Sequence, residues 1–339
     1  MVTVITSTTN RPQLLRAALC SIQRQTAREQ ITSVVVSENA GGRETRRLCA
    51  EFPDLPINFI FRDPPLRPLD HGRALYTHPD QIPSPYVAIL HDDDWWAPHH
   101  IEDGLKALAA SADAVAYWGT SFLVHGESSW FMQCWNESCW VVAGFPPTTE
   151  VVKLDKKQAA LACVGSGPAH YSSLIAKKDI LAEAFEAVYH TGNLHDNDRL
   201  LFLELSRRGP LLVNFVPDVF VRQHPAQDQR QLSSQDSYEH VAAATRIVLD
   251  YCKELQLDPG AEFERLYEKC PVETYRPYIL GTFDPRVITY LKRRNELPLP
   301  QLFRRPAPLW LAYQVCPPAL WAAARRMKRA IRPGQPAHA

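Results

Sequence analysis

The sequence has no excess of charge of either sign, because 37 lysine and arginine residues are balanced by 37 aspartate and glutamate residues. This balance excludes a uniformly basic surface of the kind that binds nucleic acid, and we expect no nucleic-acid partner. The eight cysteines form no CxxC pair and have no zinc-finger spacing. We therefore expect reduced thiols, as is usual in the cytoplasm, with a bond between Cys134 and Cys139 as the alternative.

Long apolar runs are missing as well. No stretch reaches the roughly 18 uninterrupted apolar residues that a membrane-spanning helix needs. Residues 2–6 (VTVIT) have neither the basic region nor the apolar length of a secretory signal peptide, and their β-branched side chains predict a buried strand. We therefore expect the protein to be cytoplasmic.

The first third of the chain alternates strand and helix patterns. Apolar or β-branched runs predict strands at residues 2–6, 31–37, 57–61 and 86–90. Apolar residues at helical spacing predict helices after Pro12, at about 43–51 and at about 99–110. This alternation predicts an α/β fold with a mostly parallel sheet and right-handed crossovers.

The pattern changes further along the chain. Between residues 121 and 167 the periodicity weakens, and we expect irregular strands and loops. Helices are predicted again at 178–188 and 197–207, followed by a strand at 211–215. The chain is predicted to become helical again after residue 224.

An acidic run, HDDDWW at residues 91–96, directly follows the strand predicted at 86–90. Ligands of open α/β sheets bind at the carboxyl ends of strands, so the run lies where a site belongs. Three successive carboxylates repel one another unless a cation or hydrogen-bond donors offset their charge, and a hard divalent ion such as Mn²⁺ or Mg²⁺ meets that need. The alternatives are a solvated acidic turn and a zinc site made by His91, His99 and His100, although that spacing matches no zinc signature.

Four segments together resemble family 2 glycosyltransferases of the GT-A fold, of the type that builds bacterial polysaccharides and lipopolysaccharides. They are residues 7–12 (STTNRP), 21–26 (SIQRQT), 34–39 (VVVSEN) and 90–94 (LHDDD), in the family's order and spacing. The resemblance covers roughly residues 2–224 and weakens between 118 and 164. It implies a Rossmann-like GT-A catalytic domain at residues 1–225, followed by a helical extension at 226–300 and a tail at 301–339.

The resemblance also implies which residues contact the donor. Thr8, Asn10 and Arg11 fall in the first loop, which grips the nucleobase and diphosphate. Glu38 stands where the family usually has an aspartate that binds the pyrimidine, so that both UDP- and dTDP-sugars stay open. Arg73 resembles a donor contact that precedes the acidic motif.

Metal and catalytic roles follow from the same resemblance. Asp92 and Asp93 are expected on the donor, with Asp92 at the ribose or sugar. Asp94 is expected on the metal, together with His224, which resembles the family's late histidine. Within residues 195–201 (HDNDRLL), Asp196 matches the family's general base. A carboxylate at a helix N-terminus is also an ordinary cap, so a structural role is the alternative for Asp196 and for the nearby carboxylate at position 198.

The remaining candidate residues are expected near the acceptor. His195 replaces the glutamate that the family has beside its base, and Gly167 and His170 lie in a glycine-containing loop where an acceptor or sugar would sit. Trp95 and Trp96 could form an apolar wall for a sugar ring, with a role as core anchors as the alternative.

Two polar segments follow the domain. Arg230, in the polar run 227–231, is predicted to close on the donor phosphate, unless that run is a solvated linker. In the tail, Leu320, Ala324, Met327 and Ile331 share one helical face, and basic residues lie away from it. This predicts a helix on an anionic membrane surface, at the cytoplasmic face of the inner membrane, with docking on the domain or on a dimer partner as the alternative.

Taken together, these features predict an inverting glycosyltransferase that moves a sugar from a nucleoside diphosphate to a hydroxyl of a lipid-linked glycan. A nucleotidyltransferase is one alternative, but residues 7–12 lack the glycine-rich loop of that class. The other is a membrane-bound scaffold that has lost catalysis. The altered Glu38 and His195 would fit a scaffold, whereas Asp92, Asp94 and Asp196 argue against it.

Overall fold

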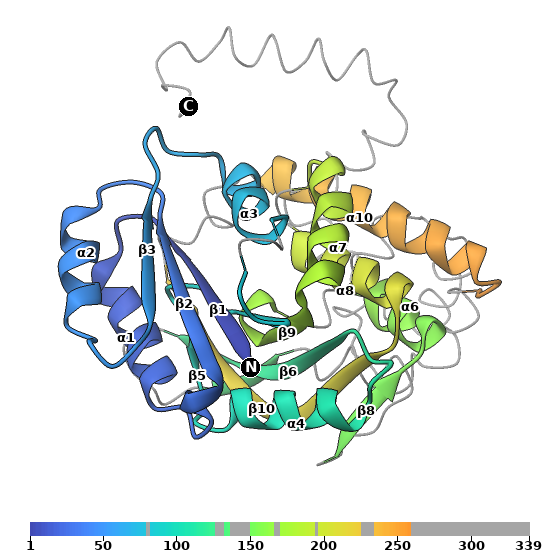
Figure 1. Ribbon diagram of the computed structural model, residues 1–339. Coiled ribbons are helices and arrows are strands. Elements are labelled where there is room, and N and C mark those ends of the chain that lie inside the picture. The colour runs from blue at the N-terminus through green and yellow to red at the C-terminus, as the bar shows by residue number, and fades with distance from the viewer. Residues whose placement is uncertain are drawn as a thin grey trace, which may run out of the picture. The chain divides into compact units, whose positions relative to one another are not determined.

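The computed structural model describes residues 1–78, 82–125, 132–135, 150–165, 170–193, 196–224 and 234–258 (Figure 1). Within these residues the strands form one sheet with the order β3-β2-β1-β4-β9-β6-β10-β5, to which β7 and β8 add at β6 and β10. The strands are β1 (Val2–Thr8), β2 (Ile31–Glu38), β3 (Ile57–Phe61), β4 (Tyr86–Ile89), β5 (Trp95–Trp96), β6 (Ala116–His125), β7 (Met132–Trp135), β8 (Val151–Leu154), β9 (Leu174–Lys177) and β10 (Leu211–Gln223).

The N-terminal half of the sheet is parallel. β1 pairs in parallel with β2 and β4, and β2 pairs in parallel with β3, so the carboxyl ends of these strands share one edge. β9 lies antiparallel between β4 and β6, whereas β6 and β10 are parallel to each other. The predicted α/β fold with a mostly parallel sheet is confirmed, with β9 as an antiparallel strand in its centre.

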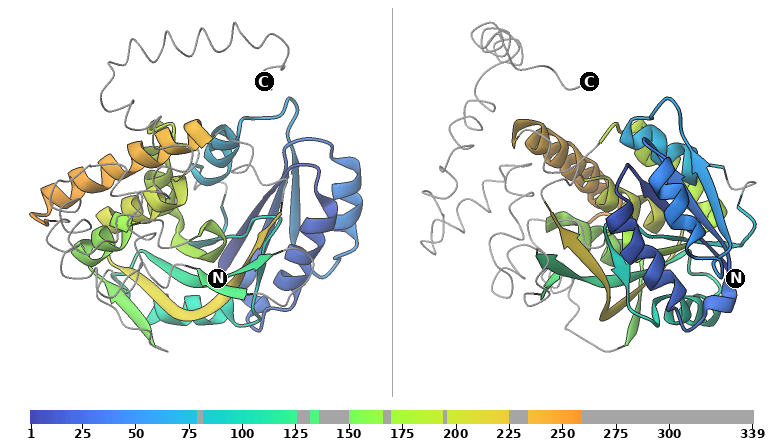
Figure 2. Two further views of the ribbon diagram at one scale, coloured as in Figure 1. Left: turned by 180° about the vertical axis from the view of Figure 1, so that it is seen from behind. Right: turned by 90° about the vertical axis from the view of Figure 1, so that its left-hand side faces the viewer.

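Helices cover both faces of the sheet. They are α1 (Pro12–Gln23), α2 (Arg43–Ala50), α3 (Pro68–Tyr76), α4 (His100–Ala110), α6 (Lys156–Gly165), α7 (Lys178–His190), α8 (Asn197–Arg208) and α10 (Ser234–Glu254). Figures 1 and 2 show α1 and α2 on one side of β1–β3 and α3, α7 and α8 on the other. A hydrophobic core packs the apolar faces of α1, α2 and α4 against the sheet.

The first helix shows how the sequence produces this packing. Pro12 occupies its first turn, where its missing N–H is not needed. Leu15, Leu19 and Ile22 recur at helical spacing and are completely buried against the sheet. The sequence pattern and the tertiary packing therefore agree at this helix.

The prediction of irregular strands and loops between residues 121 and 167 was wrong in part. α6 lies in this region, and its helix was missed because it is buried by α8 and α10 rather than along one amphipathic stripe. α10 falls within the helical extension predicted at 226–300, whereas residues 259–339, with the predicted tail, lie outside the described residues. In the described part of the chain, no helix combines the length and the apolar character needed to cross a bilayer.

Candidate functional site

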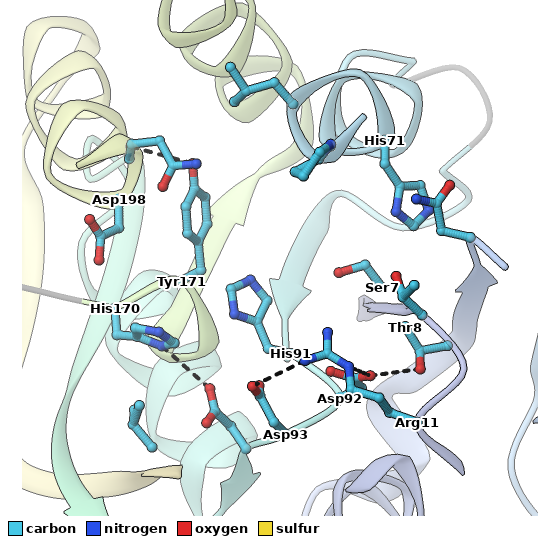
Figure 3. A pocket seen from close by; sticks show the side chains of 18 of the residues that line it. Ser7, Thr8, Arg11, His71, His91, Asp92, Asp93, His170, Tyr171 and Asp198 are labelled. Carbon is cyan, nitrogen blue, oxygen red and sulfur yellow. Dashed lines mark hydrogen bonds and ion pairs between the residues drawn. The ribbon is translucent and has the colours of Figure 1, made fainter. Parts of the chain in front are cut away.

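A cavity of about 280 Å³ opens at the carboxyl ends of β1, β2 and β4 (Figure 3). The first loop, the acidic run after β4, α3, the segment before β9, the start of α8 and the end of β10 all contribute to its wall. Its polar lining residues are Ser7, Thr8, Thr9, Arg11, Asn39, His71, Tyr76, His91, Asp92, Asp93, Asp94, His170, Tyr171, Asn197, Asp198 and Gln223. The parallel strands thus bring the first loop and the acidic motif, far apart in sequence, to one site.

In the acidic run, the carboxylates of Asp92 and Asp93 contact neighbouring polar groups. The Thr8 hydroxyl donates to Asp92 Oδ2 (2.7 Å), and Arg11 Nε lies 3.1 Å from the same oxygen. Asp93 Oδ2 lies 3.0 Å from His224 Nε2 and 3.8 Å from Arg11 Nη1. Burial alone would raise the pKa of Asp93, but the charges of His91 and Arg11 and the bond from His224 together lower it. Asp93 is therefore held in its ionised form.

Asp94 has a different environment. It is 1% exposed and accepts hydrogen bonds from the Ser172 hydroxyl and from the backbone N–H of Arg222 (3.0 Å). Burial, followed by the negative charge of Asp93, raises its pKa well above the usual range. A cation in the cavity would reverse this effect by favouring the carboxylate. Asp94 is thus a carboxylate whose ionisation a bound cation would stabilise.

His91 and His170 complete a group that could hold a cation. Possible ligand atoms of His91, Asp94 and His170 all lie within 4.8 Å of one another. His170 Nδ1 is 3.5 Å from Asp94 Oδ2, and burial, followed by the charge of His91, lowers the pKa of His170 to about 3. His224, the predicted metal ligand, lies against Asp93 and is not part of this group.

The start of α8 presents one of its two carboxylates to the cavity. Asp198 lines the cavity, whereas Asp196 is not part of its wall and pairs with the buried Arg199 (Nη1 to Oδ2, 2.8 Å). Burial, followed by the charge of Asp196, raises the pKa of Asp198 to about 7. In Figure 3, Asp198 and Tyr171 lie on the side of the cavity opposite Thr8 and Arg11. Asp196, the expected base, is thus paired with a buried arginine at the beginning of the helix.

Glu38 holds the backbone after β1 and β2 through hydrogen bonds. Its buried carboxylate accepts hydrogen bonds from the backbone N–H groups of Asn10 and Ala40 (2.9 Å each) and from the Thr45 hydroxyl. Asn10 itself has a left-handed backbone (φ 51°) and is exposed. Neither Glu38 nor Asn10 is part of the cavity wall, so the structure does not bring these two predicted donor contacts to it.

Three further candidates also lie outside the cavity wall. Arg73 forms a two-pronged ion pair with Glu186 on the surface (2.6 and 3.0 Å). Trp96 is a core residue whose indole N–H donates to the Ser172 carbonyl oxygen, and Trp95 stacks on Phe220. The interpretation of the tryptophans as anchors of the sheet therefore fits this arrangement better than a wall for a sugar ring.

Gly167, His195 and Arg230 lie outside the described residues. Conversely, the cavity includes polar residues that the sequence did not single out. Asn39 lines it while exchanging two hydrogen bonds with the backbone of Leu66, and His71 lines it while its Nε2 lies 2.8 Å from the Ser37 hydroxyl. Asn39 directly follows β2, so its position at a strand end could have identified it as a site residue. His71 comes from a helix that was not predicted.

The fold is of the GT-A type, the fold of glycosyltransferases that take their sugar from a nucleotide-sugar donor. Residues 3–162 match the family model of glycosyl transferase family 2.

Solved structures support the fold. S. aureus TarS has a TM-score of 0.53 at 12% identity, and the match covers 87% of this chain and 46% of TarS. A TarS 1-349 fragment in complex with UDP-GlcNAc has a TM-score of 0.55 at 13% identity, covering 93% of this chain and 87% of the fragment. The chain thus spans about half the length of the full TarS chain. A comparison with curated proteins found no match.

Proposed function

We propose that this protein is an inverting glycosyltransferase that moves a sugar from a UDP- or dTDP-sugar to a hydroxyl group of a glycan acceptor. The observation that carries the proposal is the arrangement of the cavity, with the acidic motif after β4 on one side and the carboxylate of Asp198 on another. Such an arrangement can hold a diphosphate and a hydroxyl on opposite sides of the sugar's anomeric carbon, as direct displacement requires.

The donor would lie along the first loop and the acidic motif. Arg11 is the cationic side chain in this part of the wall and would face a phosphate, while Thr8 and Arg11 keep Asp92 oriented. A divalent cation near Asp94 would supply positive charge for the departing diphosphate. The TarS fragment that binds UDP-GlcNAc supports a UDP-sugar, with a dTDP-sugar as the alternative.

We assign the general base to Asp198 in place of Asp196. As the acceptor oxygen forms its bond to the anomeric carbon, the bond from that carbon to the diphosphate oxygen breaks, and the hydroxyl proton passes to the carboxylate. Asp198 lines the cavity, whereas Asp196 is bound to Arg199. The raised pKa of Asp198, about 7, also matches the demand on a base that works near neutral pH.

Thermal shifts with a panel of nucleotides test the donor site. UDP or dTDP, each with Mn²⁺, should raise the Tm, by an amount that corresponds to about 2.7 kcal/mol at 100 times Kd. ADP and GDP serve as controls and should have much smaller effects. The Asp94→Ala variant should lose the metal-dependent part of the shift, because its carboxylate lies beside the proposed cation. A panel in which no nucleotide changes the Tm would refute the proposed donor site.

For the tail, we propose attachment to an anionic membrane, where a lipid-linked acceptor would be reached. The amphipathic pattern of residues 320–331 supports this. The full chain should sediment with vesicles containing phosphatidylglycerol and not with vesicles of phosphatidylcholine alone. Replacing Arg325, Arg326, Lys328 and Arg329 with glutamine should weaken binding by about 1 kcal/mol per charge. Equal binding by this variant would contradict the proposal.

A further inference from the structure

The first turn of α8, which carries Asp198, is held by side chains from other segments. The Tyr171 hydroxyl donates to the carbonyl oxygen of Asn197 (3.3 Å) from the cavity side (Figure 3). The side-chain oxygen of Asn193 accepts from the backbone N–H of Asp196 (2.9 Å). A backbone N–H at the beginning of a helix has no acceptor within that helix, so it must find one outside. The position of Asp198 therefore depends on the neighbours of α8 as well as on the helix itself.

The helix α10 contributes two of these contacts. The side-chain N–H of Asn193 donates to the carbonyl oxygen of His240 on α10 (2.7 Å), while its oxygen accepts from Asp196. Arg199 Nη1 donates to Asp196 Oδ2 (2.8 Å) and to the Thr245 hydroxyl on α10 (3.1 Å). Asn193 and Arg199 thus each connect the beginning of α8 to α10.

These connecting groups are shielded from water. The side chains of Arg199 and Thr245 are completely buried, and Asn193 is 2% exposed. Arg199 also donates to the carbonyl oxygens of Cys163 and Val164 at the end of α6, so one guanidinium group joins α6, α8 and α10. Where water is excluded, the loss of one partner leaves the others unsatisfied, so a complete network favours a single arrangement. The network is therefore suited to fix the orientation of the first turn of α8.

We propose that Asn193 and Thr245 are positioning residues for sugar transfer, which hold the first turn of α8 on α10 so that Asp198 faces the cavity. The inference rests on the proposed function, because it takes Asp198 as the general base. Neither positioning residue is part of the cavity wall, and both act through α8. A base must lie within hydrogen-bond reach of the acceptor hydroxyl, and a misplacement of about 1 Å can lower the rate about 10²-fold.

Amide hydrogen exchange tests these contacts without any donor or acceptor. In Thr245→Val and Asn193→Ala, the amides at the beginning of α8 should exchange faster than in the wild-type protein, while those at its end keep their rates. Thr245→Val removes the hydroxyl with little change in volume, and Asn193→Ala removes both bonds of the amide. Unchanged exchange at the beginning of α8 in both variants would overturn the proposal.

Turnover then tests the positioning role. Thr245→Val and Asn193→Ala should each lower kcat by about tenfold or more, while the nucleotide-induced rise in Tm, measured from the Tm of each variant, stays as in the wild-type protein. The activity is the release of nucleoside diphosphate from a UDP- or dTDP-sugar, whichever nucleotide gives the larger thermal shift. A kcat within about threefold of the wild-type value in both variants contradicts the positioning role.

Two further variants separate positioning from a general loss of stability. Thr245→Ser loses a methyl group but keeps the hydroxyl, so it should lower the Tm and keep kcat within about threefold. Arg207→Met removes the contact of the Arg207 guanidinium with the Tyr251 ring (4.2 Å), which joins α8 to α10 about 14 Å along the helix from Asp198. It should also keep kcat within about threefold. If either variant lowers kcat as much as Thr245→Val, turnover follows stability and the positioning role is wrong.

Asp198→Asn distinguishes failure of this inference from failure of the proposed function. If Asp198→Asn loses turnover while Thr245→Val and Asn193→Ala keep theirs, the base assignment stands and the positioning role falls. If Asp198→Asn itself keeps its turnover, the assignment of the base is wrong, whatever the variants at Asn193 and Thr245 do.

Discussion

Replacing Asp198 with asparagine should lower kcat for sugar transfer by about 10²- to 10⁴-fold, the usual contribution of a positioned general base. The substitution keeps the shape of the side chain but removes the group that takes the acceptor's proton. Because Asp198 lies on the side of the cavity opposite Thr8 and Arg11, where we propose that the donor binds, the nucleotide-induced thermal shift should stay as in the wild-type protein. Loss of turnover with retained donor binding is the expected result.

Asp196→Asn is the matched control. It changes the neighbouring carboxylate, which pairs with Arg199 and lies outside the cavity wall. We expect a lower Tm and a kcat within about tenfold of the wild-type value. If Asp196→Asn loses more turnover than Asp198→Asn, the base is the residue that the family resemblance indicated and our assignment is wrong.

The pH profile provides a second test of the same residue. Burial raises the pKa of Asp198 from 3.8 to about 7, and only the deprotonated form can accept a proton. Since kcat/KM reports the free enzyme, it should rise with pH through about 7 and level off above it. A rise near pH 4, at the ordinary pKa of a carboxylic acid, would exclude Asp198.

Arg199→Met should lower the free energy of unfolding by about 3–5 kcal/mol, the usual cost of breaking a buried ion pair. The Arg199 side chain is completely buried and donates to the carbonyl oxygens of Cys163 and Val164, the Thr245 hydroxyl and Asp196. Methionine fills similar space but leaves these acceptors without their donors. Urea unfolding followed by circular dichroism measures the change.

The surface ion pair of Arg73 and Glu186 provides the control for Arg199→Met. Both side chains are substantially exposed, at 45% and 33%, so Arg73→Met should cost no more than about 1 kcal/mol. If Arg199→Met and Arg73→Met cost equally little, the buried network does not hold α8 to α6 and α10. Arg73→Met should also keep the nucleotide-induced shift, because Arg73 is not part of the cavity wall.

Much of the fold could be predicted because local pattern and tertiary packing agree in the N-terminal half. β1 is buried along almost its whole length, and α1 buries one apolar stripe. The strand pattern and the helix pattern can therefore be recognised in the sequence. α6 was missed because its burial comes from neighbouring helices on more than one side. β9 was missed because a strand of four residues is too short to display a period.

The candidate site was predictable where it depends on strand ends. Asp92, Asp93 and Asp94 lie in the turn after β4, Thr8 ends β1 and Arg11 follows it, so parallel pairing alone brings them together. His170 was placed near the acceptor, whereas the structure sets its imidazole 3.5 Å from Asp94. Sequence spacing carries no information about that contact, because residues 94 and 170 meet only through the antiparallel pairing of β9 with β4.

The sequence by itself determined the fold class and the position of the acidic motif, because both follow from local periodicity and from the rule that ligands bind at strand ends. Only the tertiary structure decided which neighbours each carboxylate of the site has. Asp93 is paired with His224, Asp94 faces His91 and His170, and burial separates Asp198 from Asp196. Charge and desolvation depend on three-dimensional neighbours, and neighbours in sequence, such as Asp93 and Asp94, can therefore have opposite pKa shifts.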